Sequence, residues 1–207
     1  MTGETPANTW VTTQQTAPPV SRPQPPAPDP SAVTGPLRPQ PGAVTSVTGL
    51  PVARYSAPLT PGSWWLLGCH GGAGVTTLEQ ALPGGTDAQR LWPAPIDHVR
   101  APVLLVARSH HAGLVAAQQA ARQWAAGALP WVQLLGLVVV ADAPGRPPKA
   151  LRDLQRLVSG GVPRLWDIPW SDAWRCGEPP HTHPMRQVAV LGRDLAQTIG
   201  GTVHGRS

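Results

Sequence analysis

The most regular feature of the chain is a series of hydrophobic runs, separated by polar and glycine-containing segments. Each run has the length of a strand and carries few polar side chains, as is typical of parallel strands that are covered on both faces. The runs that we interpret as strands are Trp64–Gly68, 102–107, 131–140 and 162–170.

Segments with a helical period of hydrophobic residues follow these runs. The first is 76–82, which Pro83 and Gly84 close. In the later segments the residues expected on the inner faces are Leu114, Ala117, Ala121 and Trp124, then Leu151, Leu154 and Leu157 or Val158, and finally Met185, Val188, Leu191, Leu195 and Ile199. Ser109 and Ser171 stand where a hydroxyl can cap a helix, the imidazoles of His110 and His111 can also cap backbone donors there, and a helix is expected to start at Pro147 or Pro148.

This alternation of strands and helices predicts an α/β domain over residues 61–207, with a parallel sheet and right-handed crossovers. The stretch 86–100 lacks a clear pattern. We expect it to be irregular, with a turn of helix at 87–91.

Residues 1–60 have a different composition from the rest of the chain. Proline, threonine, alanine and glutamine dominate, and the chain as a whole has 27 prolines. Proline lacks a backbone donor and fixes φ, so we expect a disordered, partly polyproline-II tail. The tail is either a solvated spacer or, through segments 22–26 and 37–41, a ligand for an aromatic groove of a partner.

The charge and the cysteines restrict the class of protein. The formal net charge is +5, carried almost wholly by scattered arginines, because Lys149 is the only lysine. This balance permits contact with nucleic acid but supports it weakly. Two cysteines give no disulfide framework, no hydrophobic run approaches about 18 residues, and the first residues do not form a signal peptide. We therefore expect a cytoplasmic protein without a transmembrane segment.

A glycine-rich loop follows the first hydrophobic run. Small residues let a backbone approach an anion, and N–H groups at a helix start can bind phosphate. The site residues expected here are Gly71, Gly72, Gly74, Val75, Thr76 and Thr77. The N–H groups of Gly72, Gly74, Val75 and Thr76 would hold the anion and the Thr76 hydroxyl a metal, so the ligands expected are ATP or ADP with Mg²⁺. The alternative is a glycine-rich turn that only the fold requires.

The loop and two later stretches resemble the ParA/MinD partition and positioning ATPases. The sequence His70-Gly-Gly-Ala-Gly-Val-Thr-Thr77 is similar to the deviant Walker A loop K-G-G-x-G-K-T-T of that family. Residues 135–140 resemble the family's late strand, and 166–172 with 176–179 resemble its I-P-[YW]-D strand end and G-x-P. The chain is also similar to short uncharacterised actinobacterial proteins with a lysine-free loop after a proline-rich start. The resemblance implies a reduced P-loop NTPase-like fold.

The departures from the family pattern concern the groups that carry its chemistry. The resemblance implies that its two lysines contact phosphate, one of them across a dimer, and here they are replaced by His70 and Val75. A charge-assisted hydrogen bond contributes about 1.5–3 kcal/mol, so losing two lowers affinity by about two to four powers of ten. Between Leu78 and Ala101 there is no hydrophobic run, so the strand that should carry the family's magnesium-shell aspartate is expected to be deleted.

Asp142 is the candidate that remains for that aspartate. It follows Val138-Val139-Val140-Ala141 and precedes Ala143-Pro144-Gly145, the form of a Walker B segment. The same residue types also start turns. Asp142 is thus either a magnesium-shell ligand or a turn residue.

Two further groups are candidates for binding. Cys176, His181 and His183 could ligate zinc, but their spacing fits a stiff polar loop better. Trp170 and Trp174 could stack on a base or mark a protein interface.

These observations favour a non-catalytic P-loop-like protein that acts in binding or assembly, for example in plasmid or chromosome maintenance or transfer. It would have a protein partner, with a homodimer as one arrangement. The alternatives are a weak Mg²⁺-dependent nucleotidase that uses Asp142 and Thr76, and a DNA-binding accessory protein.

Overall fold

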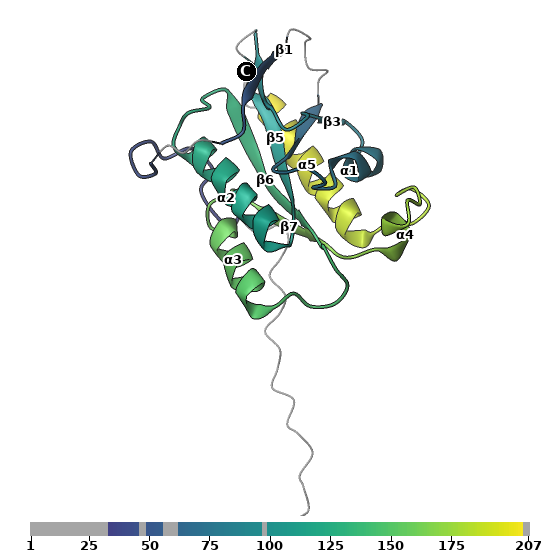
Figure 1. Cartoon of the computed structure of the whole chain (residues 1–207). Coiled ribbons are helices and arrows are strands. Elements are labelled where there is room, and N and C mark those ends of the chain that lie inside the picture. The colour runs from purple at the N-terminus through teal and green to yellow at the C-terminus, as the bar shows by residue number, and fades with distance from the viewer. Residues whose placement is uncertain (1–32, 46–48, 56–61, 97–98, 205–207) are drawn as a thin grey trace, which may run out of the picture.

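A parallel β-sheet forms the centre of the molecule (Figure 1). The computed structural model describes residues 33–45, 49–55, 62–96 and 99–204. The five strands of the sheet are β2 (Trp64–Gly68), β3 (Gly85–Asp87), β5 (Ala101–Arg108), β6 (Val132–Val140) and β7 (Leu165–Ile168). They lie in the order β3-β2-β5-β6-β7, and each neighbouring pair is parallel. The expected α/β class and the parallel sheet are confirmed.

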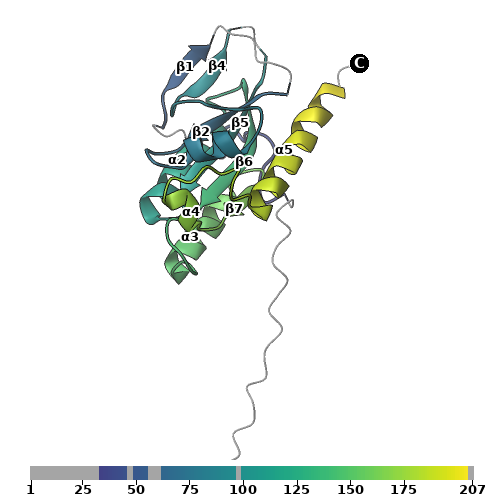
Figure 2. The ribbon, with the colours of Figure 1, turned by 90° about the vertical axis from the view of Figure 1, so that its right-hand side faces the viewer.

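Helices cover both faces of this sheet. The helices are α1 (Val75–Ala81), α2 (His111–Ala125), α3 (Lys149–Ser159), α4 (Asp172–Arg175) and α5 (Arg186–His204). Helices α2 and α3 lie on one face and α1 and α5 on the other, as two views of the ribbon show (Figures 1 and 2). Their inner side chains belong to two separate hydrophobic clusters. No helix in the described part is long and apolar enough to cross a membrane.

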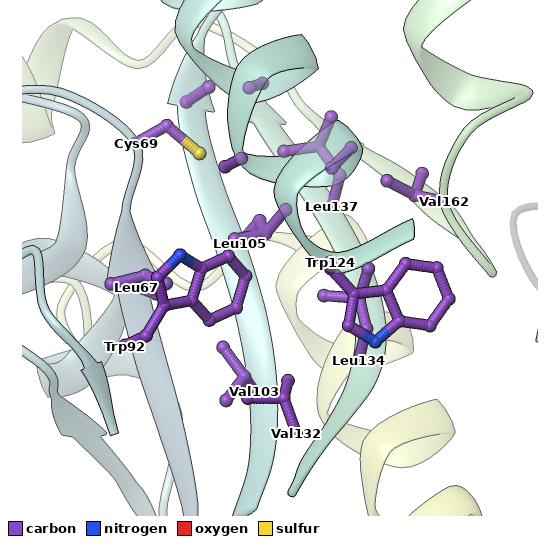
Figure 3. Close-up of a cluster of buried hydrophobic side chains, with 14 of the residues drawn as sticks. Leu67, Cys69, Trp92, Val103, Leu105, Trp124, Val132, Leu134, Leu137 and Val162 are labelled. Carbon is purple, nitrogen blue, oxygen red and sulfur yellow. The ribbon is translucent and has the colours of Figure 1, made fainter. Parts of the chain in front are cut away.

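Strand β2 contributes to both cores because successive side chains of a strand point to opposite faces. Trp65 and Leu67 belong to the cluster under α2 and α3, whereas Trp64 and Leu66 belong to the cluster under α1 and α5. Figure 3 shows the indoles of Trp92 and Trp124 among the leucine and valine side chains of the first cluster. This two-sided burial explains the continuous hydrophobic runs in the sequence.

Most helix faces lie where the sequence places them. Leu114, Ala117, Ala121 and Trp124 of α2 are buried, and so are Val188, Leu191 and Leu195 of α5. On α3 the inner residue is Val158, because Leu157 is 64% exposed. Ser171 caps α4 as expected, accepting a hydrogen bond from the Trp174 N–H.

Of the residues expected to cap the start of α2, His110 does so and Ser109 does not. His110 Nδ1 accepts from the Gly113 N–H at 2.9 Å. The Ser109 hydroxyl instead accepts from the backbone N–H of Asp142 at 3.0 Å, which ties the end of β5 to the end of β6.

A small second sheet shows that the structured part of the chain begins before the expected boundary at residue 61. Strand β1 (Val52–Tyr55), inside the expected tail 1–60, pairs in parallel with β4 (Trp92–Pro95). The Trp92 N–H donates to the carbonyl of Pro51, the residue before β1, and the Ile96 N–H donates to the Tyr55 carbonyl at the end of β1. Pro93 and Pro95 alternate with these donors along β4. The missing proline N–H groups therefore fall on the side of β4 that faces away from β1, so proline does not prevent this ladder.

A second part of the expected tail also packs on the domain. The Thr34 N–H donates to the Pro163 carbonyl at 3.0 Å, and the Gln40 N–H to the Ala125 carbonyl at 2.8 Å. The described residues 33–45 and 49–55 therefore belong to the structured part of the chain. Segment 22–26 and the rest of the expected tail lie outside the described residues.

The stretch expected to be irregular contains strands β3 and β4, so this prediction was wrong. Strand β3 has only three residues, Gly85, Thr86 and Asp87, so it offers no hydrophobic run to detect. It forms because β2 supplies an open edge beside it. Between Leu78 and Ala101, where no strand was expected, the chain forms the short edge strand β3 and the strand β4.

Candidate functional site

The strand order marks one end of the sheet as the place for a site. The chain runs from β2 to β3 on one side and then to β5 on the other side of β2. In doubly wound sheets of this kind, ligands bind beyond the carboxyl ends of the strands where the order reverses. Here that point lies between the loops after β2 and after β5.

The loop after β2 is the glycine-rich segment. Gly72 has φ 73° and Gly74 has φ 101°, a left-handed conformation that favours glycine. Helix α1 begins at Val75, and Gly74 provides no side-chain cap for its first turn. Gly71, Gly72 and Thr76 are exposed. The loop thus has the backbone freedom that the sequence indicates.

Val75 does not take part in the surface of this loop. Its side chain is 9% exposed and packs with Trp64, Leu78 and other residues under α1 and α5. A Cβ placed on Gly68 would lie 3.0 Å from Val75 Cγ2, so the valine fills the space at the end of β2. The position directly after the last glycine of the loop is therefore a core position in this protein.

A crevice lies at the carboxyl ends of the strands, beside the loop. Its lining comes from the loop and α1, from the ends of β5 and β6, and from the segment between β7 and α4. The lining residues are Gly74, Thr77, Leu78, Arg108, Val140, Ala141, Pro169, Trp170, Ser171, Trp174 and Arg175. It therefore combines a glycine backbone, a threonine hydroxyl, two arginines and two indoles.

Arg108 is a charged residue that is hydrogen bonded to the loop backbone. Its Nε donates to the Gly72 carbonyl at 3.3 Å and its Nη1 to the Ala141 carbonyl at 2.9 Å. A Cβ added to Gly74 would lie 3.8 Å from its Nη2. Burial lowers the pKa of Arg108, the nearby Asp142 charge raises it, and the Arg175 charge lowers it. An arginine stays protonated under such shifts, so Arg108 places a fixed positive charge beside the loop.

The far wall of the crevice is formed by α4 and the residues before it. Trp170 Nε1 donates to Asp172 Oδ1 at 2.7 Å, which holds that indole. The indole nitrogen of Trp174 is buried and has no hydrogen-bond partner among the described residues. A buried donor without a partner is costly.

Asp142 lies just beyond the carboxyl end of β6 and is exposed. Strand β5 separates β6 from β2, and Asp142 is followed by bends through Gly145, whose φ is 80°. Its charge acts on Arg108. This arrangement is that of a turn residue that also compensates part of the arginine charge.

His70 joins the loop to the end of β5. Its Nδ1 lies 2.8 Å from the Gly71 carbonyl, and its Nε2 lies 3.0 Å from the Arg108 backbone nitrogen. Burial lowers the pKa of His70; the hydrogen bond to Gly71 raises it, and the charges of His110, Arg108 and Arg90 lower it.

The turn between β3 and β4 brings a further arginine toward His70. Gln89 and Arg90 both have left-handed backbone conformations, with φ 51° and 62°. Such conformations are uncommon for residues other than glycine. The Asp87 carboxylate supports the turn by accepting from the Gln89 N–H at 2.7 Å.

The cysteine and histidine residues weighed as metal ligands do not form a metal site. In the described part of the chain, no three His, Cys, Asp or Glu side chains lie close enough to hold a metal ion. His183 Nε2 is hydrogen bonded to Glu178 Oε2, and Cys176 is an exposed free thiol. Cys69, at the start of the loop, is buried, and burial raises the pKa of its thiol to about 12.

A family model covers this site. The family of unknown function DUF6668 matches residues 62–191. The chain belongs to DUF6668. The region matched to DUF6668 contains every residue that lines the crevice, whereas β1 lies before it. No curated protein and no solved structure matches the chain.

The structure brings together some of the expected site residues and adds others. Gly74 and Thr77 line the crevice, whereas Gly71, Gly72, Val75, Thr76 and Asp142 do not. Sequence reasoning missed Arg108 and Arg175, because it looked for a lysine as the substitute charge. A signal was present, since Arg108 directly follows a hydrophobic run, at the strand end where parallel sheets place their sites.

Proposed function

We propose that this protein is a non-catalytic, P-loop-like binding or assembly protein whose crevice binds a phosphate-bearing ligand, with a nucleotide as the favoured class. The observation that carries the proposal is the position of Arg108, which contacts the loop backbone and lines the crevice together with Arg175. Paired guanidinium groups suit phosphate, which they can contact through several donors at once. Trp174 and Trp170 offer surfaces for a base.

The same residues argue against turnover. Magnesium-dependent phosphoryl transfer needs oxygen ligands for the metal and a group that orients the nucleophile. Beside this loop the fixed charge is the Arg108 cation, which repels a divalent metal, and Asp142 is exposed in a turn. We therefore expect the ligand to bind without Mg²⁺, which distinguishes the proposed role from that of the related partition ATPases and from a weak nucleotidase.

The test is a titration of the full chain with ATP, ADP and inorganic phosphate, each with and without Mg²⁺, by calorimetry. Arg108→Ala and Arg175→Ala should each lower the affinity about ten-fold or more, because each removes a charge-assisted hydrogen bond. Arg193→Ala is the matched control, since Arg193 is an exposed arginine on α5 that does not line the crevice.

Two results would contradict the proposal. Equal binding by the Arg108→Ala, Arg175→Ala and wild-type proteins would show that the crevice is not the site. Steady Mg²⁺-dependent hydrolysis that Asp142→Ala abolishes would show that the protein is an enzyme.

A further inference from the structure

The imidazole of His70 completes the backbone hydrogen bonding of the sheet where β2 ends. The Cys69 N–H still donates to the Val106 carbonyl of β5 at 2.9 Å, as in a parallel ladder. After Cys69 the chain turns into the glycine-rich loop. The next backbone N–H of β5 that points toward β2 is that of Arg108. It donates to His70 Nε2 at 3.0 Å. The side chain thus takes the place of a strand carbonyl.

The two hydrogen bonds of His70 define its protonation state. The Gly71 carbonyl can only accept, so Nδ1 must carry a proton. The Arg108 backbone N–H can only donate, so Nε2 must present a lone pair. Together these contacts require the neutral Nδ1–H tautomer. A second proton would set two N–H groups against each other.

The first turn of α2 lies close to one side of the His70 ring. A Cβ added to Gly113 would lie 2.9 Å from His70 Nε2 and 2.4 Å from the Arg108 carbonyl oxygen. The hydrogen bond from the Arg108 N–H to Nε2 joins the loop to β5, so we expect protonation of Nε2 to weaken this connection.

A second histidine, His110, also accepts a hydrogen bond from a backbone N–H. His110 caps α2 with a bare Nδ1 that accepts from the Gly113 N–H at 2.9 Å. The centroids of the two imidazole rings are 5.0 Å apart. The groups whose charges act on His70 are His110 at the start of α2, Arg108 at the end of β5 and Arg90 in the turn after β3, and all three are bases. A proton on the His70 ring is therefore opposed by its neighbours.

We propose that His70 forms an acid-operated release for the glycine-rich loop. At neutral pH its unprotonated Nε2 holds the loop to β5. On acidification the protonated ring gives up the Arg108 N–H, and the loop, which contributes Gly74 to the crevice, separates from β5. This device belongs to the ligand-free protein and does not depend on the proposed function.

The pH range follows from the direction of the shift. Burial lowers the pKa of His70 below 6.5 in the folded protein, so the folded state binds fewer protons than the unfolded state. The stabilising contribution is therefore fully present above about pH 6.5 and is lost as the pH falls below that value toward the folded pKa.

The test is amide hydrogen exchange of Arg108 in the ligand-free full chain between about pH 7.5 and about pH 5, expressed as protection factors. In the wild type, protection should fall about three- to ten-fold, as expected for the loss of one hydrogen bond. His70→Gln can accept from Arg108 and donate to Gly71 without titrating, so it should retain protection and lose the pH dependence. His111→Gln, a change at the exposed neighbour, should behave like the wild type.

A second measurement does not depend on any variant. The ¹⁵N shifts of the His70 ring in the wild type should show the neutral Nδ1–H tautomer at neutral pH. An Nε2–H tautomer or a charged ring at neutral pH would overturn the proposal. So would Arg108 protection that does not change with pH in the wild type, or that changes equally in His70→Gln.

Discussion

Arg108 and Val75 show how single residues divide two roles around the glycine-rich loop, the charge beside the loop and the packing beneath it. The residue after the last loop glycine is a buried valine, and the positive charge beside the loop comes from the end of β5. A charge on a strand end is held by two backbone carbonyls, those of Gly72 and Ala141. The loop residue is then free to serve the core.

Val75→Lys should therefore destabilise the protein. Placing an ammonium group among Trp64, Leu78 and their neighbours should lower the free energy of unfolding by about 2–4 kcal/mol. Urea denaturation measures this change. Thr76→Lys, at an exposed position one residue further, should change the stability by less than about 0.5 kcal/mol. Equal stability of the two variants would mean that side chain 75 can leave the core.

Strand β6 illustrates how one element adapts to both of its neighbours. The register with β5 shifts between Val103 and Leu104, so that Val103 pairs with Leu134 and Leu104 pairs with Gly136. Such a bulge bends a strand and often requires glycine. Gly136 has φ 154°, and a Cβ there would lie 2.5 Å from the Arg164 carbonyl oxygen and 2.5 Å from Trp166 Cζ3 of β7. The bulge thus lets β7 pack closely on β6.

Gly136→Ala should cost about 2–4 kcal/mol of stability, because the contact is with backbone and a buried indole that cannot move aside. Thermal unfolding followed by circular dichroism checks this expectation. Gly71→Ala is a suitable control, since its added Cβ would meet no atom within 4 Å. A wild-type melting temperature for Gly136→Ala would contradict the tight β6–β7 contact.

At the scale of the whole molecule, the segment before β2 serves as a cover for one core. Val44, Leu50 and Tyr55 pack against the cluster under α2 and α3, and the Tyr55 ring lies 4.5 Å from that of Trp65. Gln123 of α2 holds this cover by donating to the Leu50 carbonyl at 2.9 Å and accepting from Trp92 Nε1 at 2.7 Å. The cover therefore connects β1, β4 and α2.

A fragment that begins at residue 61 should consequently be less stable than one that begins at residue 33. Loss of three partly buried side chains and their hydrogen bonds should lower the free energy of unfolding by about 2–4 kcal/mol, measured by urea denaturation. Tyr55→Ala in the longer fragment should reproduce part of the loss. Identical denaturation midpoints for the two fragments would show that the cover contributes nothing.

The sequence by itself determined the layered architecture. The runs around β2, β5 and β6 are hydrophobic on both faces, so their pattern identifies buried parallel strands without reference to any neighbour. The inner faces of α2 and α5 follow from the helical period in the same way. The glycine-rich loop after β2 was equally evident, because its left-handed turns need glycine.

Only the tertiary structure decided where the short strands and the charged groups lie. Strands β1, β3 and β4 have only three or four residues, and β3 contains glycine and β4 proline, so these strands form only because an adjacent strand offers its edge. The positions of Arg108 and His70 beside the loop depend on which strand is the neighbour of β2, and a strand order cannot be read from hydrophobic periods. The crevice is accordingly a property of the assembled sheet.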